Sequence, residues 1–487
     1  MAKRKESTLE RLRKGERLNR RERKQVAARW SWADPGLDIV NRDAAGIDIG
    51  NESHSVAVPP GRDAQPVREF GSWTADLEKR ALWLKACGIQ TVAMPSTGVY
   101  WMAVYDVRPS HGFPLNLVDA RGTKHLPGRK REVPECQWLL QLHTYGWRRS
   151  CFLPPEPIRW RRTVGRLRDQ HVKEAGRSVQ HMQRALTEMN VQLHNAISDL
   201  NGVTGQAIVR AILAGERDPA RLAALRDRRI QARPEELVES LRGNWKEDVL
   251  FELQQAVDAY DFHRQQMAQC DAQLQRYMAA LPSREPVCEL PAVEAAAPAG
   301  GKKRKRRAPR KPRKAKGNQP AFDLQPELQR ILGVDATTID GIDVMTVQTV
   351  LAEVGPDLRA WKSERHWSSW LNLAPKREVS GGRVIRHTRE HRTNRVGNAF
   401  RMAAQSLIRS ESYLGARFRY LRAKLGGIKA VKAMARHLAC LFYGLVTKGQ
   451  AWVDRGAAEF ERRRQEREFA TLQRKARDFG MTLVPAA

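Results

Sequence analysis

Several features are scarce in this sequence, and each absence excludes a class of protein. The 487 residues contain six cysteines, and no two of them have the C-x-x-C spacing of a metal-binding or redox pair. No apolar run approaches the roughly 18 residues that a membrane-spanning helix needs. The sequence therefore predicts reduced thiols, a cytoplasmic location and no membrane partner.

Acidic residues are also too few to balance the basic ones. There are 54 Asp+Glu against 86 Lys+Arg, which gives a formal net charge of +32 and an isoelectric point of about 10.5. A field of that size favours a polyanionic partner such as nucleic acid. The hydrophobic share of 41% is enough for packed cores, and the length predicts two or three domains. Residues 1–43 form a basic N-terminal arm.

Residues 44–155 have the pattern of an α/β domain. Gly46 to Gly50 and Ser55 to Val58 read as two strands joined at Asn51-Glu52, which predicts a hairpin. Further strands are predicted at 89–94 and 114–120, and helices at 77–87 and 99–110. Strands that alternate with helices indicate a mixed sheet covered by helices.

Residues 156–281 are predicted to be helical, with two heptad seams. The first seam runs from Ala175 to Ala196 and the second from Leu250 to Met278. Two such segments separated by a looped stretch favour an antiparallel coiled-coil arm or an oligomerisation element. Ordinary helices packed within one domain remain the alternative.

Residues 282–320 read as a disordered basic linker, and 321–487 as a helical domain with short loops. The linker's cations either contact nucleic-acid phosphates, which the overall charge favours, or form a solvated tether; they are Lys302, Lys303, Arg304, Lys305, Arg306 and Arg307. In the last domain, TTIDGIDVMTVQTVLAEVG resembles a helix-hairpin-helix unit whose amides near Gly341 would meet a phosphate. An ordinary helix-helix turn fits the same residues equally well.

Three carboxylates are candidates for a metal site, although each signal is weak alone. Asp48 lies within an apolar strand, where a carboxylate is costly unless it binds something. Strand-borne aspartates hold Mg²⁺ in nucleases of the ribonuclease H type, but a hydrogen-bonding role at a loop edge fits Asp48 as well. Glu132 and Glu135 have the spacing of one helix face. Because Pro134 is tolerated only in a first turn, we expect the helix to begin near it and to leave Glu132 outside.

Ser380 is a candidate nucleophile in a cationic loop. Flanking glycines let a backbone approach a phosphate closely, and nearby cations would stabilise a pentavalent phosphorus. Taken alone, a simple Ser-Gly-Gly turn is the preferred interpretation of these residues. The loop residues proposed to contact nucleic acid are Lys376, Arg377, Gly381, Gly382, Arg383, Arg386 and Arg389.

Several segments together, in order and spacing, resemble one known family over residues 40 to 485. The family is that of insertion-sequence transposases with a DEDD motif, the IS-one-ten family of bridge-RNA-guided recombinases. The segments are GIDIGNESHSVAV, MPSTGVYW, GRKREVPECQWLLQLHTYG, HNAISDLNGVTGQAIVRAILAGERDP, NQPAFDL and LNLAPKREVSGG.

The resemblance implies a fold and a composite activity. Expected are an α/β RuvC-like (ribonuclease H-type) domain with four metal-binding carboxylates, a helical coiled-coil region, and an α-helical transposase domain with a nucleophilic serine. Members join DNA at a site made by two subunits, while a structured guide RNA pairs with donor and target DNA. The implied partners are therefore element-end and target DNA, guide RNA and a second copy, in the prokaryotic cytoplasm near the nucleoid.

Carrying the family motif onto this sequence shows where the chain departs from it. The first aspartate falls on Asp48 and the serine on Ser380. The family's glutamate falls on Pro95, and its last two aspartates fall on Glu132 and Glu135.

These departures predict an impaired metal site. Mg²⁺ demands near-octahedral oxygen ligands at about 2.0–2.1 Å, and constellations of this kind tolerate displacements of roughly 0.5 Å. Two alternatives stay open: a non-catalytic protein that binds RNA or DNA, and an active recombinase in which water replaces the missing ligand. A junction nuclease is disfavoured because Ser380 would then have no task.

Overall fold

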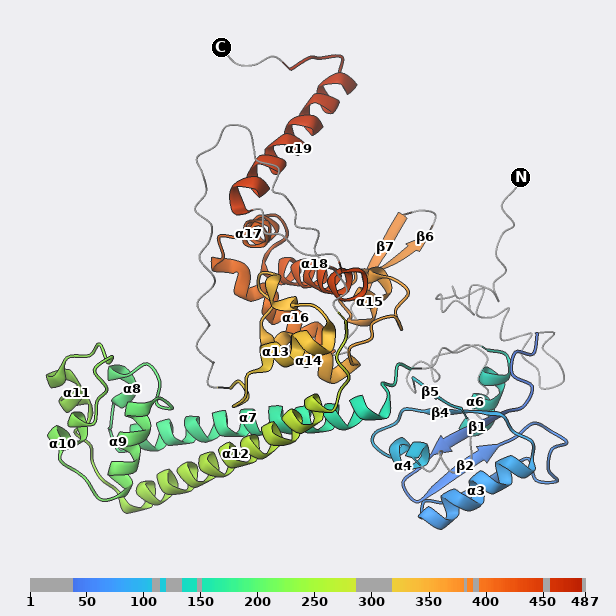
Figure 1. Ribbon diagram of the computed structural model, residues 1–487, viewed down its shortest axis with the longest axis horizontal. Coiled ribbons are helices and arrows are strands. Elements are labelled where there is room, and N and C mark those ends of the chain that lie inside the picture. The colour runs from blue at the N-terminus through green and yellow to red at the C-terminus, as the bar shows by residue number, and fades with distance from the viewer. Residues whose placement is uncertain are drawn as a thin grey trace. The chain divides into compact units, whose positions relative to one another are not determined.

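The protein consists of two compact units, Met1–Leu153 and Pro154–Ala487 (Figure 1). The structure is a computed structural model, and it describes residues 38–106, 114–119, 134–146, 151–285, 318–380, 383–388, 394–449 and 456–483. Most of the predicted basic arm and linker lies outside these ranges. Within them, no helix is long and apolar enough to cross a membrane.

The first unit contains a five-stranded mixed sheet in the order β3-β2-β1-β4-β5. The central strand β1 is antiparallel to β2 and parallel to β4. The strands are β1 (Ala44–Ile49), β2 (Ser53–Ala57), β3 (Val67–Gly71), β4 (Thr91–Pro95) and β5 (Leu115–Val118), and the helices are α3 (Thr74–Ala86), α4 (Trp101–Asp106) and α6 (Glu135–Thr144). The predicted hairpin, the strands β4 and β5, and the mixed character of the sheet are confirmed.

Helix α6 lies directly against the central strand. A Cβ atom at Gly46 would stand 2.2 Å from the carbonyl oxygen of Cys136 and 2.4 Å from the amide nitrogen of Leu140. Only glycine permits so close an approach of two backbones. Gly46 therefore lets the first turns of α6 pack directly on the middle of β1.

In the second unit, two helices of 33 residues each form a long antiparallel pair. They are α7 (Glu156–Glu188) and α12 (Glu247–Ala279), which lie side by side in Figure 1. Trp160 stacks on Tyr277 with centroids 4.9 Å apart, and farther along His171 meets His263 at 5.4 Å. As the first number rises the second falls, which is the register of antiparallel neighbours. At about 1.5 Å per residue each helix is about 50 Å long.

The stretch between these helices folds into a small helical head that shares one hydrophobic core with α7 and α12. Its buried side chains include Leu193, Ile208, Ile212, Leu222 and Leu237. The head consists of α8 (Leu193–Ala196), α9 (Val203–Leu213), α10 (Pro219–Ala224) and α11 (Pro234–Ser240). A looped stretch between the two seams is the prediction from sequence, and these four helices correct it.

The first heptad seam does not stay on one helix. Helix α7 ends at Glu188, and Asn190 follows with a φ of 56°, in the left-handed region that stops a helix. Met189 and Leu193 are nevertheless fully buried, because they pack in the core of the head. The expectation of a continuous helical seam to Ala196 is therefore wrong, although its apolar residues are core residues.

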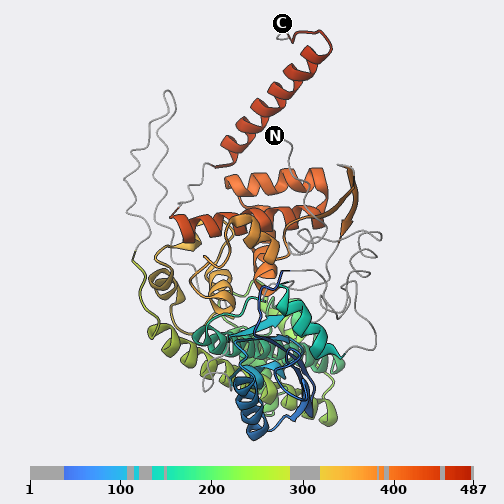
Figure 2. The same ribbon diagram turned by 90° about the vertical axis from the view of Figure 1, so that its right-hand side faces the viewer.

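The C-terminal helices surround a buried helix, α18 (Gly427–Lys448). Against it pack α15 (Glu364–Trp370), α16 (Arg395–Ser406) and α17 (Tyr413–Leu425). Fully buried Trp367 donates its Nε1–H to the carbonyl oxygen of Ala439 at 3.1 Å. The remaining helices are α13 (Leu324–Leu332), α14 (Val344–Val354) and α19 (Gly456–Asp478), with 3-10 turns at Ala336–Thr338 and Leu407–Arg409. Helix α19 extends away from the others in both views (Figure 2).

The expected all-helical C-terminal domain contains a two-stranded sheet. Strand β6 (Lys376–Ser380) pairs antiparallel with β7 (Arg383–Thr388), with an irregularity at Glu378/Val379. The sequence predicts a cationic loop here, and the strand pair corrects that prediction. Its Val379, Val384 and Ile385 are residues with high strand propensity, but the charges around them hid the signal.

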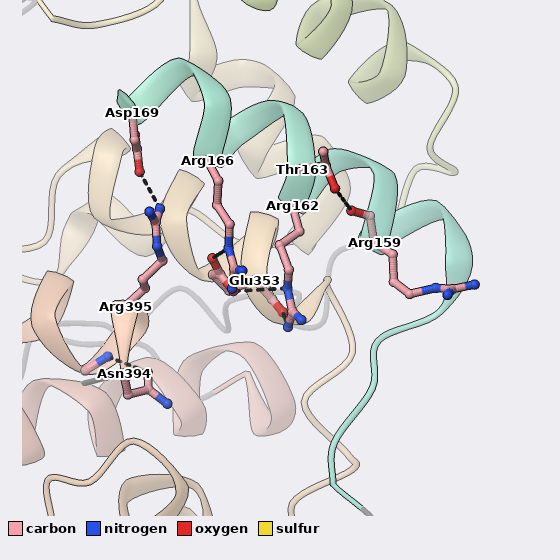
Figure 3. A network of polar contacts seen from close by, with 9 residues as sticks. Arg159, Arg162, Thr163, Arg166, Asp169, Glu353, Asn394 and Arg395 are labelled. Carbon is pink, nitrogen blue, oxygen red and sulfur yellow. Dashed lines mark hydrogen bonds and ion pairs between the residues drawn. The ribbon is translucent and has the colours of Figure 1, made fainter. Parts of the chain in front are cut away.

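Arginines of α7 join the long helix pair to the C-terminal helices (Figure 3). Arg166 donates from Nε and Nη2 to the two carboxylate oxygens of Glu353 in α14, each at 2.8 Å. Arg162 approaches the same carboxylate at 3.0 Å, and Arg395 binds Asp169 at 2.8 Å. Bidentate pairs of this kind fix orientation as well as contact.

A second ion pair lies deeper, and its removal is expected to loosen the helix pair. Arg168 and Asp271 link α7 to α12, with side chains only 4% and 8% exposed. Asp271→Ala would leave a buried guanidinium without its carboxylate, which costs about 3–5 kcal/mol. Hydrogen exchange measured by mass spectrometry should show loss of protection in peptides of both helices.

The matched control removes an exposed aspartate from the same region. Asp169 and Arg395 are 47% and 40% exposed, so Asp169→Ala should cost about 0–1 kcal/mol. Equal loss of protection in the two variants would contradict the assignment of Arg168–Asp271 as the main polar link of the pair.

Candidate nucleic-acid interface

Asp48 lies at the carboxyl end of the central strand and is half-buried. Its strand neighbours Ile47 and Ile49 are buried, and it stands opposite Ser55 of β2. On the other side, the parallel register of Gly46 with Ala93 leads along β4 toward Pro95. The sequence-predicted positions 48 and 95 therefore lie side by side, at the carboxyl ends of two adjacent parallel strands.

Pro95 closes β4 as a buried residue paired with Val118. The next residue, Ser96, donates from its backbone N–H and its hydroxyl to the carbonyl oxygen of Val118, at 3.0 and 3.2 Å. The strand end is thus well ordered and geometrically suited to present a side chain at the sheet edge. Proline supplies no ligand oxygen there.

Glu135 is the first residue of α6, the helix that packs on β1, the strand that carries Asp48. The helix begins at Glu135, with extended Pro134 at its N-cap, so the predicted start near Pro134 is confirmed. Burial, together with the negative charge of Asp48, raises the pKa of the neighbouring Cys136 thiol to about 11. Asp48 lies two residues along β1 from Gly46, which packs against the carbonyl of Cys136, so it is close to the first turn of α6. Glu132 lies outside the described residues.

These residues do not fit a four-carboxylate magnesium site. Within the described ranges, no three His, Cys, Asp or Glu side chains gather into a group that would hold a metal ion. Asp48 and Glu135 alone supply too few oxygens for an ion that demands near-octahedral coordination.

Ser380 is the last residue of β6 and pairs with Arg383, the first residue of β7. Ser380 therefore has a defined position in a strand pair. Lys376, Arg377 and Arg386 belong to the same two strands, with Arg386 opposite Glu378. Gly381, Gly382, Arg389 and the linker cations 302–307 lie outside the described residues.

The turn at Gly341 is packed inward. Gly341 has a φ of 88°, and a Cβ there would meet the carbonyl oxygen of Ala403 at 2.8 Å. The Asp343 side chain accepts from the amide of Thr346 and caps α14. A carboxylate therefore already satisfies this helix start, which favours the ordinary turn over a phosphate site.

The arginine-rich start of α7 has a role that was not predicted from the sequence. Arg161 is fully buried and donates to Gln348 at 2.8 Å; its burial lowers the pKa of the guanidinium to about 10. The signal was the segment RWRRTVGRLRD, but its partners are about 190 residues away in sequence. These arginines bind Gln348 and Glu353 within the fold and are therefore not candidates for contacts with nucleic-acid phosphates.

One known family resembles part of the C-terminal helices. Residues 336–419 match the family model described as Transposase IS116/IS110/IS902 family. The match runs from the Ala336 turn into α17 and includes the β6–β7 hairpin, whose first strand ends at Ser380. No curated protein matches the chain. The match supports a transposase of this kind, and with it a protein that binds DNA.

Proposed function

We propose that this chain is a transposase that binds DNA and a structured guide RNA. It would join DNA through the hydroxyl of Ser380, which lies in the segment that matches the transposase family. In that step the serine oxygen would bond to a DNA phosphorus, and the deoxyribose oxygen would leave as a hydroxyl. The observation that carries the proposal is the inclusion of the Ser380 hairpin in the matched segment 336–419. The position of Ser380 at the end of β6, inside that segment, supports the choice of this serine as the nucleophile.

We further infer that the first unit is RuvC-like and that its metal centre is impaired. The central strand carries Asp48 next to its last residue, a parallel strand beside it ends at position 95, and α6 starts nearby with Glu135. This is a geometry in which carboxylates from several elements would converge. Pro95 removes one of them, and the added methylene of Glu135, like that of Glu132, displaces another.

The same substitution favours a second candidate, a non-catalytic protein that binds nucleic acid. Pro95 abolishes a ligand without affecting the cationic residues of the second unit. Strand transfer assayed with DNA that flanks the coding sequence, and with RNA transcribed from it, separates the two candidates. Binding without any joined product, even after the three altered carboxylate positions are restored, would favour the second.

Assembly of two copies remains part of the proposal, but it needs a surface other than the heptad seams. Both seams are largely buried within one chain, where α7 and α12 pack on each other and on the head. We infer that two subunits meet on nucleic acid through the second unit.

Binding to nucleic acid should depend steeply on salt. Each phosphate neutralised by a cation contributes a slope of about 0.9 to log K against log salt. With 6–10 such contacts as an estimate, affinity would fall by roughly 10³ to 10⁵ between 50 and 200 mM salt. Fluorescence anisotropy with labelled duplex DNA measures this slope.

Two linker variants separate the contribution of the basic tract from that of linker length. Replacing the six cations of residues 302–307 by glutamine should lower the slope. Deleting residues 292–298, which contain no Lys or Arg, should leave it unchanged. A flat response of the unmodified protein would contradict phosphate-dominated binding.

A further inference from the structure

A groove of about 620 Å³ lies between α17 and α19, away from the Ser380 hairpin in sequence. Its volume is in the range of about 300–1,000 Å³ typical of ligand sites. In Figures 1 and 2, α19 rises from the side of α17 and leaves this region at the edge of the C-terminal helices. The lining residues are Arg417, Tyr420, Leu421, Lys424, Phe460, Arg464, Arg467, Glu468, Thr471 and Leu472.

Aromatic rings and cations alternate along this groove. The guanidinium of Arg464 lies 5.7 Å from the ring centroid of Tyr420, and the ammonium of Lys424 lies 6.0 Å from it. Phe460, 5.9 Å from the same ring, is buried and anchors α19 to α17. Tyr420 is therefore a fixed ring flanked by positive charge.

The charge of the groove is not balanced by its own residues. Four cations face one carboxylate, Glu468, which with Glu461 also pairs with Arg464. Burial and the nearby charge of Arg467 lower the pKa of Arg417. Among the described residues, the buried Nε of Arg417 has no hydrogen-bond partner. Several positive charges that line one groove favour an anion between them.

We propose that this groove binds a single-stranded segment of nucleic acid, with a base stacked on Tyr420 and its phosphates on Arg417 and Arg467. The inference rests on the proposed function and adds a site to it. A concave site suits an unpaired base, because every base offers a flat face to an aromatic ring whatever its sequence. A duplex would meet cations on a convex surface instead, and an acidic peptide would gain nothing from the stacked ring.

The test uses the full chain and short oligonucleotides of uridine or thymidine, with 4-thiouridine or 4-thiothymidine for crosslinking. We expect crosslinks in the peptide that contains Tyr420. Tyr420→Leu should weaken binding by roughly 5- to 150-fold, the range expected for one stacked base. Arg467→Gln should lower the salt slope by about 0.7, as for one contact with a single strand.

Control variants keep the proposal falsifiable. Arg474→Gln removes the same charge from an exposed position of α19 outside the groove, and it should retain the crosslink. Tyr420→Phe keeps the ring and should retain binding, which separates stacking from a folding defect. Crosslinks to either RNA or DNA support the site, and their ratio identifies the strand.

Three outcomes would count against the groove. If the oligonucleotides bind but Arg467→Gln behaves like Arg474→Gln and no crosslink reaches α17, this site is wrong and the proposed function is unaffected. If a polyglutamate peptide competes fully and Tyr420→Leu binds it unchanged, the groove recognises acidic protein instead. If the unmodified chain binds neither duplex DNA nor oligonucleotides, the proposed function itself fails.

Discussion

Restoring the three altered carboxylate positions is expected to raise Mg²⁺-dependent strand transfer by about 10²-fold or more, since misplacing reacting groups by about 1 Å costs this much. The variant combines Pro95→Glu, Glu132→Asp and Glu135→Asp. Position 95 closes β4 next to the strand that carries Asp48, and Glu135 starts the helix over that strand. Pro95→Glu alone should do little, because groups that act as one unit are strongly non-additive.

Pro134 sets the second condition for this repair. Its backbone is extended, with φ of −51° and ψ of 144°, so α6 begins only at Glu135. Proline also disfavours a helical conformation of the residue that precedes it, so a helix rarely extends past a proline toward the N-terminus. Pro134→Leu should therefore be needed as well if residue 132 must join the helical face of residue 135.

An isosteric control separates charge from shape in this experiment. Pro95→Gln, Glu132→Asn and Glu135→Asn give side chains of the same size as the repaired set, without the carboxylates. This control should remain as inactive as the unmodified chain, while the repaired variant gains activity only when Mg²⁺ is present. A gain in both variants would mean that backbone relief at Pro95, rather than metal binding, had been limiting.

Loss of the hydroxyl at position 380 should abolish any covalent protein–DNA adduct. In the repaired protein, Ser380→Ala removes the proposed nucleophile, while DNA affinity should change by less than about threefold because phosphate contacts dominate the interface. The adduct would be measured on denaturing gels with end-labelled DNA.

Another serine of the same domain provides the matched control. Ser369 is exposed on α15, within the matched transposase segment, and Ser369→Ala should leave the adduct intact. An adduct that persists in Ser380→Ala would refute the assignment of the nucleophile and would direct the search to other hydroxyls of the domain.

Where apolar runs alone decide an element, the sequence predicted the fold well. β1, β2, β4 and β5 were predicted from short apolar segments with turn residues between them. Strand β3 was missed because Arg68 and Glu69 interrupt its apolar pattern at the sheet edge. The β6–β7 hairpin was missed for the same reason, since its cations resemble a phosphate-binding loop more than a strand.

Long-range polar contacts were beyond sequence reasoning. The pattern RWRRTVGRLRD says that α7 carries many cations, but not that Glu353 and Gln348 bind three of them from a helix about 190 residues away. Heptad spacing likewise predicted which residues are buried without showing where α7 ends. At the metal positions, only the family resemblance gave Pro95 a meaning, because a proline at a strand end is otherwise unremarkable.

Strand transfer by the unmodified chain tests the central claim most directly, that this is a transposase with an impaired metal centre. The assay would use labelled DNA from both flanks of the coding sequence, RNA transcribed from them, and Mg²⁺, beside the repaired variant at equal protein concentration. The account predicts salt-sensitive binding by both proteins and joined product from the repaired variant alone. Equal rates of joining by the two proteins would contradict it.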